Sequence, residues 1–193
     1  MTSSNQMKRT KTHAFCIYHN TYNKMAKILD ATGSITSIDS IILEAKKYII
    51  LVSPFWDCPK NVILSLLGAL KNGVQVVIFC RPTQKNGKEK TLPIPRKSWG
   101  YFRKFEEEGK FIVLSKDLDT LHSKLYMNEN KCLITSLNMY DFSVKKNIEL
   151  GIELSWLDEH DKELKRFVMR HLNEICEKAG LNAKNPIIPD AKL

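Results

Sequence analysis

The chain has 193 residues, of which 43% are hydrophobic and 26% charged, an ordinary globular composition with enough residues for one well-buried core. It has neither the apolar N-terminal stretch of a signal peptide nor a run of eighteen apolar residues. We therefore expect a cytoplasmic protein without stable membrane association, and not a secreted or membrane-spanning one. The net charge of +9 indicates a polyanionic partner, either nucleic acid or anionic lipid.

The cysteine pattern and the chain ends suggest a simple organisation. Five cysteines occur without a CxxC pair, which fits reduced thiols in a cytosolic protein. We expect one domain over residues 13–180, preceded by a flexible basic tail over residues 1–12. Residues 181–193 contain Pro186 and Pro189 and are expected to form an irregular tail.

The first half of the chain predicts helices that alternate with buried strands. The expected elements are a helix of about ten residues from Ile38, a strand over 48–52, a helix from Pro59 to Gly73 and a strand over 74–79. Thr36 or Ser37 is placed to cap the first of these helices. The continuous apolar run of the second strand indicates burial on both faces.

A basic segment over residues 81–97 follows that second strand. It holds six cations and one acid, and it could overhang a site at the end of the strand. We therefore predict that it binds substrate, and the residues predicted to do so are Arg81, Lys85, Lys88 and Lys90.

The second half adds a hairpin to the alternating pattern. The expected elements are a helix around 99–105, a strand over 111–114, hairpin strands over 121–127 and 131–136, a strand over 148–154 and a helix over 159–179. Asn128, Glu129 and Asn130 provide turn chemistry between the hairpin strands. This order favours an α/β fold, with a mixed, mostly parallel sheet flanked by helices on both faces.

Polar residues recur at the ends of the last three predicted strands. Side chains alternate along a strand, so His122 and Lys124 point the same way and can bind one ligand together. Ser136 and Asn138 form a second such pair, and Glu149 begins the next strand. Together they could bring a nucleophile, a cation, a hydroxyl, an amide and a carboxylate to one phosphate.

A His-x-Lys triplet alone is weak evidence, and the chain contains a second one at 160–162. That triplet begins a predicted helix, where positions i and i+2 diverge by about 200°. No acid stands five residues after Lys162. We therefore assign the site to His122 and Lys124.

With its downstream residues, this segment resembles the HKD motif of the phospholipase D superfamily, H-x-K-x4-D followed by G-[ST]-x-N and a Glu. The corresponding residues here are His122, Lys124, Glu129, Ser136, Asn138 and Glu149. Glu129 takes the place of the usual Asp, and Thr135 that of the usual Gly. The resemblance implies a phospholipase D-like fold and a catalytic role for these residues.

The family mechanism uses two facing motifs, in which one histidine attacks phosphorus and the other protonates the leaving oxygen. This chain has one motif, so the resemblance implies an active site completed by homodimerisation, with His122 facing its symmetry mate. Lys124 and Asn138 would stabilise charge on the phosphate oxygens. Glu149 would orient an imidazole.

The resemblance requires no metal or cofactor, and the sequence supplies no ligand cluster, so we predict activity independent of divalent ions. Two aromatic residues are further predicted to contact substrate. Trp56 follows a strand end together with Phe55 and could stack a base or cover the site, with a place in the apolar core as the alternative. Tyr126 is expected on the face of His122 and Lys124.

Three functions are compatible with these features. The first is a metal-independent nuclease that cleaves nucleic acid through a phosphohistidine intermediate. DNA is the expected substrate ahead of RNA. The second is a phospholipase or phosphatidyl transferase with the same chemistry, although no amphipathic membrane-docking surface is evident. The third is a non-catalytic nucleic-acid-binding module of the same fold.

Overall fold

The computed structural model of the protein describes residues 26–82, 84–85, 88–89, 94, 96–140, 147–158 and 161–181. The tail predicted over 1–12, nearly all of the tail predicted over 181–193 and Lys90 lie outside the described residues. For Lys85 and Lys88 the backbone alone is described.

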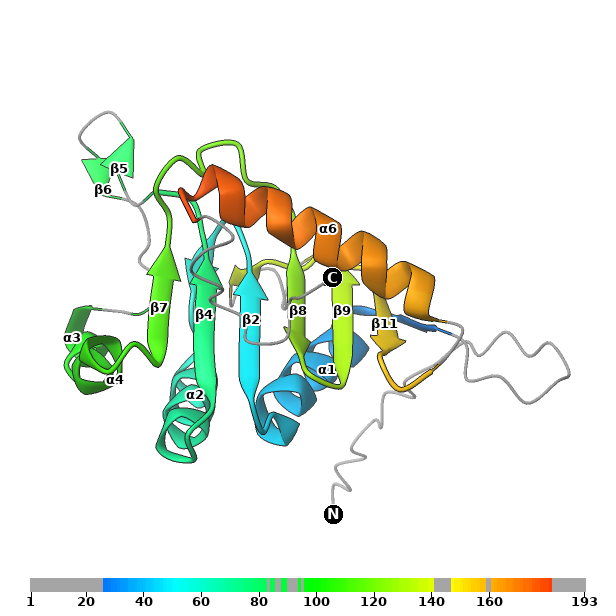
Figure 1. Ribbon diagram of the computed structural model, residues 1–193, viewed down its shortest axis with the longest axis horizontal. Coiled ribbons are helices and arrows are strands. Elements are labelled where there is room, and N and C mark those ends of the chain that lie inside the picture. Colours follow the sequence, from blue (N-terminus) through cyan, green and yellow to red (C-terminus); the bar gives the residue numbers. More distant parts are fainter. Residues whose placement is uncertain are drawn as a thin grey trace, which may run out of the picture.

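A mixed sheet forms the centre of the protein, as predicted, but it has seven strands where the sequence indicated six (Figure 1). Its strands, in spatial order, are β1 (Lys27–Leu29), β11 (Gly151–Ser155), β9 (Lys131–Thr135), β8 (Leu125–Asn128), β2 (Tyr48–Val52), β4 (Gln75–Phe79) and β7 (Phe111–Leu114). Pairing is parallel between β2, β4 and β7 and antiparallel between the other neighbours. Two of the six neighbouring pairs are therefore parallel, so the sheet is mixed as predicted but not mostly parallel, because the hairpin strands and the strand that follows them run antiparallel to their neighbours.

Helices cover both faces of this sheet, which confirms the predicted layers. Helices α1 (Ala31–Glu44) and α2 (Lys60–Lys71) pack on one face, and the long helix α6 (Lys162–Lys178) crosses the other (Figure 1). Each face has its own apolar core: Ile41 and Leu66 belong to the first, and Val168 and Leu172 to the second. No helix in the described ranges is both long and apolar enough to cross a bilayer.

Helix α1 begins earlier than the sequence indicated. The carboxylate of Asp30 accepts a hydrogen bond from the backbone N–H of Gly33 at 2.7 Å and caps the helix. The predicted caps are therefore wrong: Thr36 and Ser37 lie inside the helix, where Ser37 is buried and donates to Glu153 on β11. The helix gains a turn because Asp30 satisfies its first N–H groups.

Other boundaries differ in small ways. The helix predicted around 99–105 is split into α3 (Arg96–Trp99) and α4 (Arg103–Glu107), and β8 begins at Leu125 rather than at 121. Short ribbons that the sequence did not indicate are β3 (Trp56–Asp57) paired with β10 (Met139–Tyr140), and β5 (Gln84–Lys85) paired with β6 (Lys88–Glu89). Pairing of β3 with β10 ties the segment after β2 to the segment after β9.

Candidate active site

The polar residues singled out by the sequence meet at one edge of the sheet. His122 and Lys124 precede β8, Ser136 and Asn138 follow β9, and Glu149 precedes β11. Because β9 runs antiparallel to both neighbours, its end lies beside the start of each (Figure 1, top). Three successive segments of the chain thus deliver their side chains to one place.

His122 and Lys124 lie against each other. The Nζ atom of Lys124 donates to the backbone O of His122 at 2.8 Å and lies 3.3 Å from Nδ1 of its ring. These residues lie outside the strand proper, but a 3.2 Å bond from the backbone N–H of Thr135 to Lys124 O extends the hairpin toward them. His122 is exposed and Lys124 is half-buried, so a solvent-borne ligand can reach the imidazole.

Ser136 and Glu149 form the second contact of the site. The Ser136 hydroxyl donates to Oε2 of Glu149 and accepts from the backbone N–H of Leu150 at 3.1 Å. The buried Glu149 carboxylate also accepts from the amide of Asn147 at 3.1 Å. Glu149 was expected to orient an imidazole, but the contacts within the described residues assign it to Ser136 and Asn147 instead.

Thr135 builds the turn at the position where the related motif has glycine. Its hydroxyl donates to Leu150 O at 2.9 Å and accepts from the N–H of Leu137 at 3.1 Å. Its φ is not positive, so the β-branched side chain fits without left-handed strain. The threonine therefore fixes the chain between Ser136 and Asn138 by hydrogen bonds.

Asn138 is half-buried, and its Oδ1 atom is buried without a hydrogen-bond partner among the described residues. A buried polar atom left unpaired costs roughly 1–3 kcal/mol, so such atoms are uncommon in folded proteins and need a specific reason. The neighbouring backbone is held firmly, since Ser53 Oγ accepts from Met139 N at 3.1 Å. The Asn138 amide is therefore positioned by the neighbouring backbone, while its Oδ1 atom has no hydrogen-bond partner among the described residues.

The charge of Lys124 is tuned by its neighbours. Burial lowers the pKa of its ammonium group below the ordinary 10.5, the nearby Arg81 guanidinium lowers it further, and the Glu149 carboxylate acts in the opposite direction. Arg81 itself donates from Nε to the backbone O of Leu121 at 2.7 Å. Arg81, predicted to bind substrate, is thus held directly beside the His-x-Lys segment.

Glu129 lies at the other end of β8, away from the site. Its carboxylate accepts hydrogen bonds from the backbone N–H groups of Lys46 at 2.7 Å and Lys47 at 3.4 Å. The catalytic assignment of Glu129 is therefore corrected: it ties the hairpin turn to the start of β2. The four residues of β8 separate it from Lys124.

The two aromatic residues predicted to contact substrate are buried instead. Tyr126 is fully buried, and burial raises the pKa of its hydroxyl. The hydroxyl donates a hydrogen bond to the backbone O of Leu137 at 2.9 Å, so Tyr126 supports the segment before Asn138. Trp56 is 1% exposed and donates from Nε1 to Ser53 O at 2.7 Å. Both predictions are wrong because these rings fill the core on the α1–α2 face.

One set of contacts near the site was missed. The hydroxyl of Ser123 lies 2.7 Å from Nε2 of His171 on α6, and Nδ1 of His171 lies 3.6 Å from Glu174. Alternation could have indicated that Ser123, between two site residues, points to the opposite side, where α6 lies.

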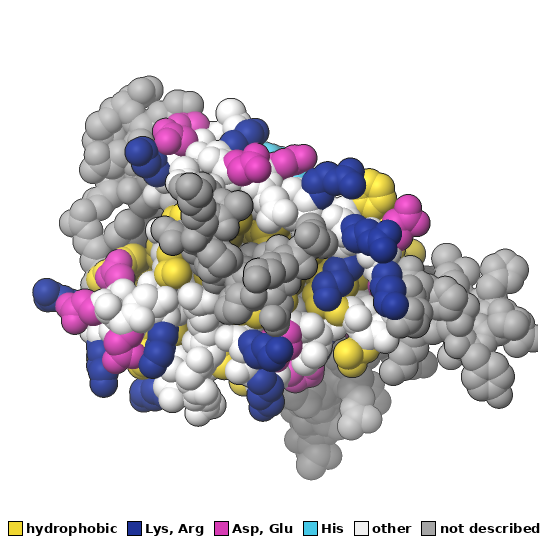
Figure 2. Space-filling view, viewed as in Figure 1, with side chains coloured by type: hydrophobic (Ala, Val, Ile, Leu, Met, Phe, Trp, Pro, Cys, Tyr) yellow, Lys and Arg dark blue, Asp and Glu magenta, His cyan; other side chains and the backbone are white. Residues whose placement is uncertain are grey.

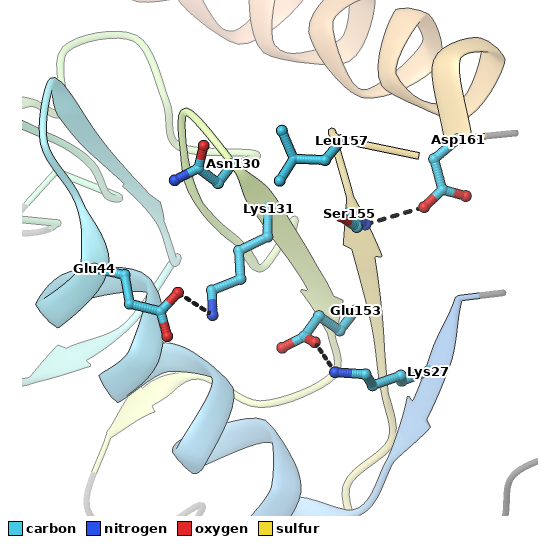
Figure 3. Close-up of a pocket in the computed structure, with 8 residues that line it drawn as sticks. All are labelled: Lys27, Glu44, Asn130, Lys131, Glu153, Ser155, Leu157 and Asp161. Atoms are coloured by element: carbon cyan, nitrogen blue, oxygen red, sulfur yellow. Dashed lines mark hydrogen bonds and ion pairs between the residues drawn. The ribbon is translucent and has the colours of Figure 1, made fainter. Parts of the chain in front are cut away.

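A pocket of about 350 Å³ lies at the opposite ends of β9 and β11 (Figure 3). It holds two ion pairs: Lys27 pairs with Glu153 at 2.9 Å, and Lys131 pairs with Glu44 at 2.8 Å. It shares no residue with the site described above.

Within the described ranges, no group of three or more His, Cys, Asp or Glu side chains is placed to hold a metal ion. Metal independence remains a prediction.

The sequence matches a known protein family. The family described as "Cardiolipin synthase, PLD-like domain" matches residues 38–171, which include all the residues gathered at this sheet edge. No curated protein sequence matches the chain.

Solved structures show the same fold at low sequence identity. Nuc, a phospholipase D family member from Salmonella typhimurium, aligns with a TM-score of 0.57 and 17% identity over 80% of this chain and 96% of that one. A phosphatidylserine synthase from Haemophilus influenzae aligns with a TM-score of 0.58 and 18% identity over 80% of this chain and 39% of that one. TrmBL2, an archaeal chromatin protein with a described mode of DNA binding, aligns with a TM-score of 0.52 and 18% identity over 78% of this chain and 52% of that one.

Proposed function

Because the chain belongs to the phospholipase D superfamily, we propose that it is a phosphodiesterase that cleaves nucleic acid without a metal ion, with DNA preferred to RNA as the substrate. The observation that carries this proposal is the meeting of His122, Lys124, Ser136 and Asn138 at one sheet edge. An imidazole beside an ammonium group and an amide matches the needs of a phosphate under nucleophilic attack. Retention of the whole set favours catalysis over binding alone.

The reaction proceeds in two displacements. A ring nitrogen of His122 attacks phosphorus and forms a P–N bond, while the P–O bond to the leaving nucleotide breaks and the leaving oxygen takes a proton from a second imidazole. Water then attacks phosphorus, gives its proton to that second imidazole, and the P–N bond breaks. Lys124 and Asn138 stabilise the negative charge on the non-bridging oxygens in both steps.

The second imidazole is His122 of another copy of the chain. Phosphodiester cleavage by this route needs a base and an acid, and the sequence contains a single motif of this kind. A two-fold axis beside the site would place the two copies of His122 opposite each other. The neutral ring then attacks phosphorus, and the protonated ring gives its proton to the leaving oxygen.

A row of exposed isoleucines supports this assembly. Ile28, Ile152 and Ile134 are direct cross-strand partners on β1, β11 and β9, and they are 45%, 40% and 41% exposed. Leu150 and Ile148, still more exposed, continue the apolar surface toward Glu149. A contiguous apolar surface of this kind marks an interaction site, and here it adjoins the half-site that needs a partner.

Positive charge favours a polynucleotide substrate. The net charge is +9, and the first half of α6 carries Lys162, Lys165, Arg166 and Arg170, along which Figure 2 shows Lys and Arg side chains gathered. Such a surface attracts polyphosphates by releasing their condensed counterions. The DNA binding described for TrmBL2, which has a similar fold, points the same way.

A lipid phosphodiesterase or phosphatidyl transferase is the second candidate. The exposed Ile148 and Leu150 flank Glu149 and could contact acyl chains as well as another copy of the protein. The phosphatidylserine synthase from Haemophilus influenzae has a similar fold. The same site chemistry would serve a lipid phosphodiester.

The test is a substrate panel in excess EDTA: labelled single- and double-stranded DNA, RNA, and phosphatidylcholine vesicles, each with the wild type and with His122→Ala. The proposal expects cleavage of DNA by the wild type and none by the variant. Lipid turnover alone would establish the second candidate. DNA binding without cleavage of any substrate would indicate a binding module.

A further inference from the structure

We propose that Phe55 and Arg81 form a subsite for one unpaired nucleotide next to the cleaved phosphodiester, with the base against the Phe55 ring and its phosphate on Arg81. This subsite makes single-stranded nucleic acid the preferred substrate. The inference rests on the nuclease function proposed above and specifies its substrate.

Phe55 is an exposed ring on a fixed segment. It is 38% exposed, whereas the adjacent Trp56 is buried and anchored to Ser53. Ser53 Oγ donates to Phe55 O at 2.8 Å, and Arg81 N donates to Pro54 O at 3.4 Å. The ring is therefore presented to solvent by a backbone held at both ends, so little entropy would be lost when a flat ligand binds.

Arg81 connects this ring to the site. Its guanidinium carbon lies 5.0 Å from the centroid of the Phe55 ring, and its Nε donates to Leu121 O at 2.7 Å, one residue before His122. Its charge also acts on the Lys124 ammonium group. Phe55, Arg81 and the His-x-Lys segment thus form one continuous surface.

The chemistry of the pair favours a nucleobase over a lipid headgroup. A phenyl ring and a planar guanidinium both stack on the flat face of a base, and arginine also binds phosphate. A choline headgroup could bind an aromatic ring through its positive charge, but the Arg81 guanidinium, 5.0 Å from the centroid of the Phe55 ring, would repel a second cation. Bases within a duplex are stacked on their neighbours and offer no free face.

The experiment compares Phe55→Leu, which keeps the apolar volume, with Phe55→Trp, which keeps the stacking surface. Each is assayed for kcat and KM on a single-stranded oligodeoxynucleotide and on the same oligonucleotide with abasic units beside the cleavage position. Tyr101→Leu, which removes an exposed ring from the segment between α3 and α4, is the control.

Phe55→Leu is expected to raise KM on the base-containing strand about tenfold, to change kcat less than about twofold, and to leave the abasic strand unaffected. Phe55→Trp and Tyr101→Leu are expected to keep the wild-type KM. Equal losses on both strands, or no loss on either, would overturn the subsite while leaving the nuclease proposal intact.

If the wild type cleaves no nucleic acid, fluorescence anisotropy with the same two oligonucleotides decides the matter. A weaker affinity of Phe55→Leu for the base-containing strand alone would keep the subsite in a protein that binds without cleaving. Identical affinities of wild type and variant would overturn it.

Discussion

The Nζ atom of Lys124 lies 3.3 Å from Nδ1 of His122, and the same ammonium group donates to the backbone O of His122 at 2.8 Å. A fixed positive charge and a nucleophilic ring are thereby directed to the same point. A phosphate at that point would contact both groups at once, which is the arrangement that lowers the barrier to attack on an anionic phosphodiester.

Removal of the ammonium group tests this arrangement. Lys124→Gln is expected to lower kcat on a nucleic-acid substrate by roughly a hundredfold or more, since one preorganised charge on the transition state is lost. Lys60→Gln removes an exposed lysine at the start of α2 and should keep wild-type kinetics. A loss confined to KM would mean that Lys124 binds substrate without stabilising the transition state.

Removal of the Arg81 charge and removal of the Glu149 charge should shift the pH profile of activity in opposite directions. Burial lowers the pKa of Lys124 below 10.5, Arg81 lowers it further and Glu149 raises it. Activity that needs the ammonium form falls as the pH rises through this pKa. Arg81→Gln should therefore move the alkaline limit of activity to higher pH, and Glu149→Gln should move it to lower pH. A common shift of both variants in one direction would contradict this assignment.

The isoleucine row should hold the active assembly together. Ile152→Glu places a charge at the centre of the row and is expected to give a monomer in sedimentation equilibrium, with cleavage lost in parallel. Leu64→Glu, at an exposed position on α2, should leave both assembly and activity unchanged. An Ile152→Glu protein that remains dimeric would place the interface elsewhere, and an active monomer would refute the shared site.

Glu129 should matter for stability and not for catalysis. Glu129→Gln weakens the charge-assisted bonds to the N–H groups of Lys46 and Lys47 and is expected to cost about 1 kcal/mol of unfolding free energy, or about 2–4 °C in Tm. kcat should stay within about twofold of the wild type. Glu177→Gln, on the exposed side of α6, is the control for loss of a carboxylate. A hundredfold drop in kcat would restore Glu129 to the active site.

Local sequence patterns were sufficient for most of the fold. Strand β2 coincides with its predicted range because five consecutive apolar residues are buried there, and α6 follows its apolar stripe closely. The start of α1 was missed because its cap, Asp30, precedes a stretch containing Gly33 that lacks an apolar pattern. The β3–β10 ribbon was missed because its two-residue strands join segments that are far apart in the chain.

The spacing of polar residues in the sequence was sufficient to find the site, but it did not give the role of every residue in it. Tyr126 was placed by counting in steps of two from His122, but alternation gives the face of a side chain and not its burial, and Tyr126 is fully buried. For the neighbouring rings of Phe55 and Trp56, a hydrogen bond to Ser53 O decides which one is buried. The sequence placed Glu149 near Ser136, but spacing alone could not show that its carboxylate accepts a hydrogen bond from the Ser136 hydroxyl and does not orient an imidazole.

The most direct test of the account is to trap the covalent intermediate. The protein is mixed with an end-labelled single-stranded oligodeoxynucleotide in excess EDTA, quenched with alkali to preserve a P–N bond, and digested for mass spectrometry. The account predicts a nucleotidyl adduct on His122 in the wild type and neither adduct nor cleavage in His122→Ala. Cleavage that persists in His122→Ala, or that appears only when a divalent ion is supplied, would contradict it.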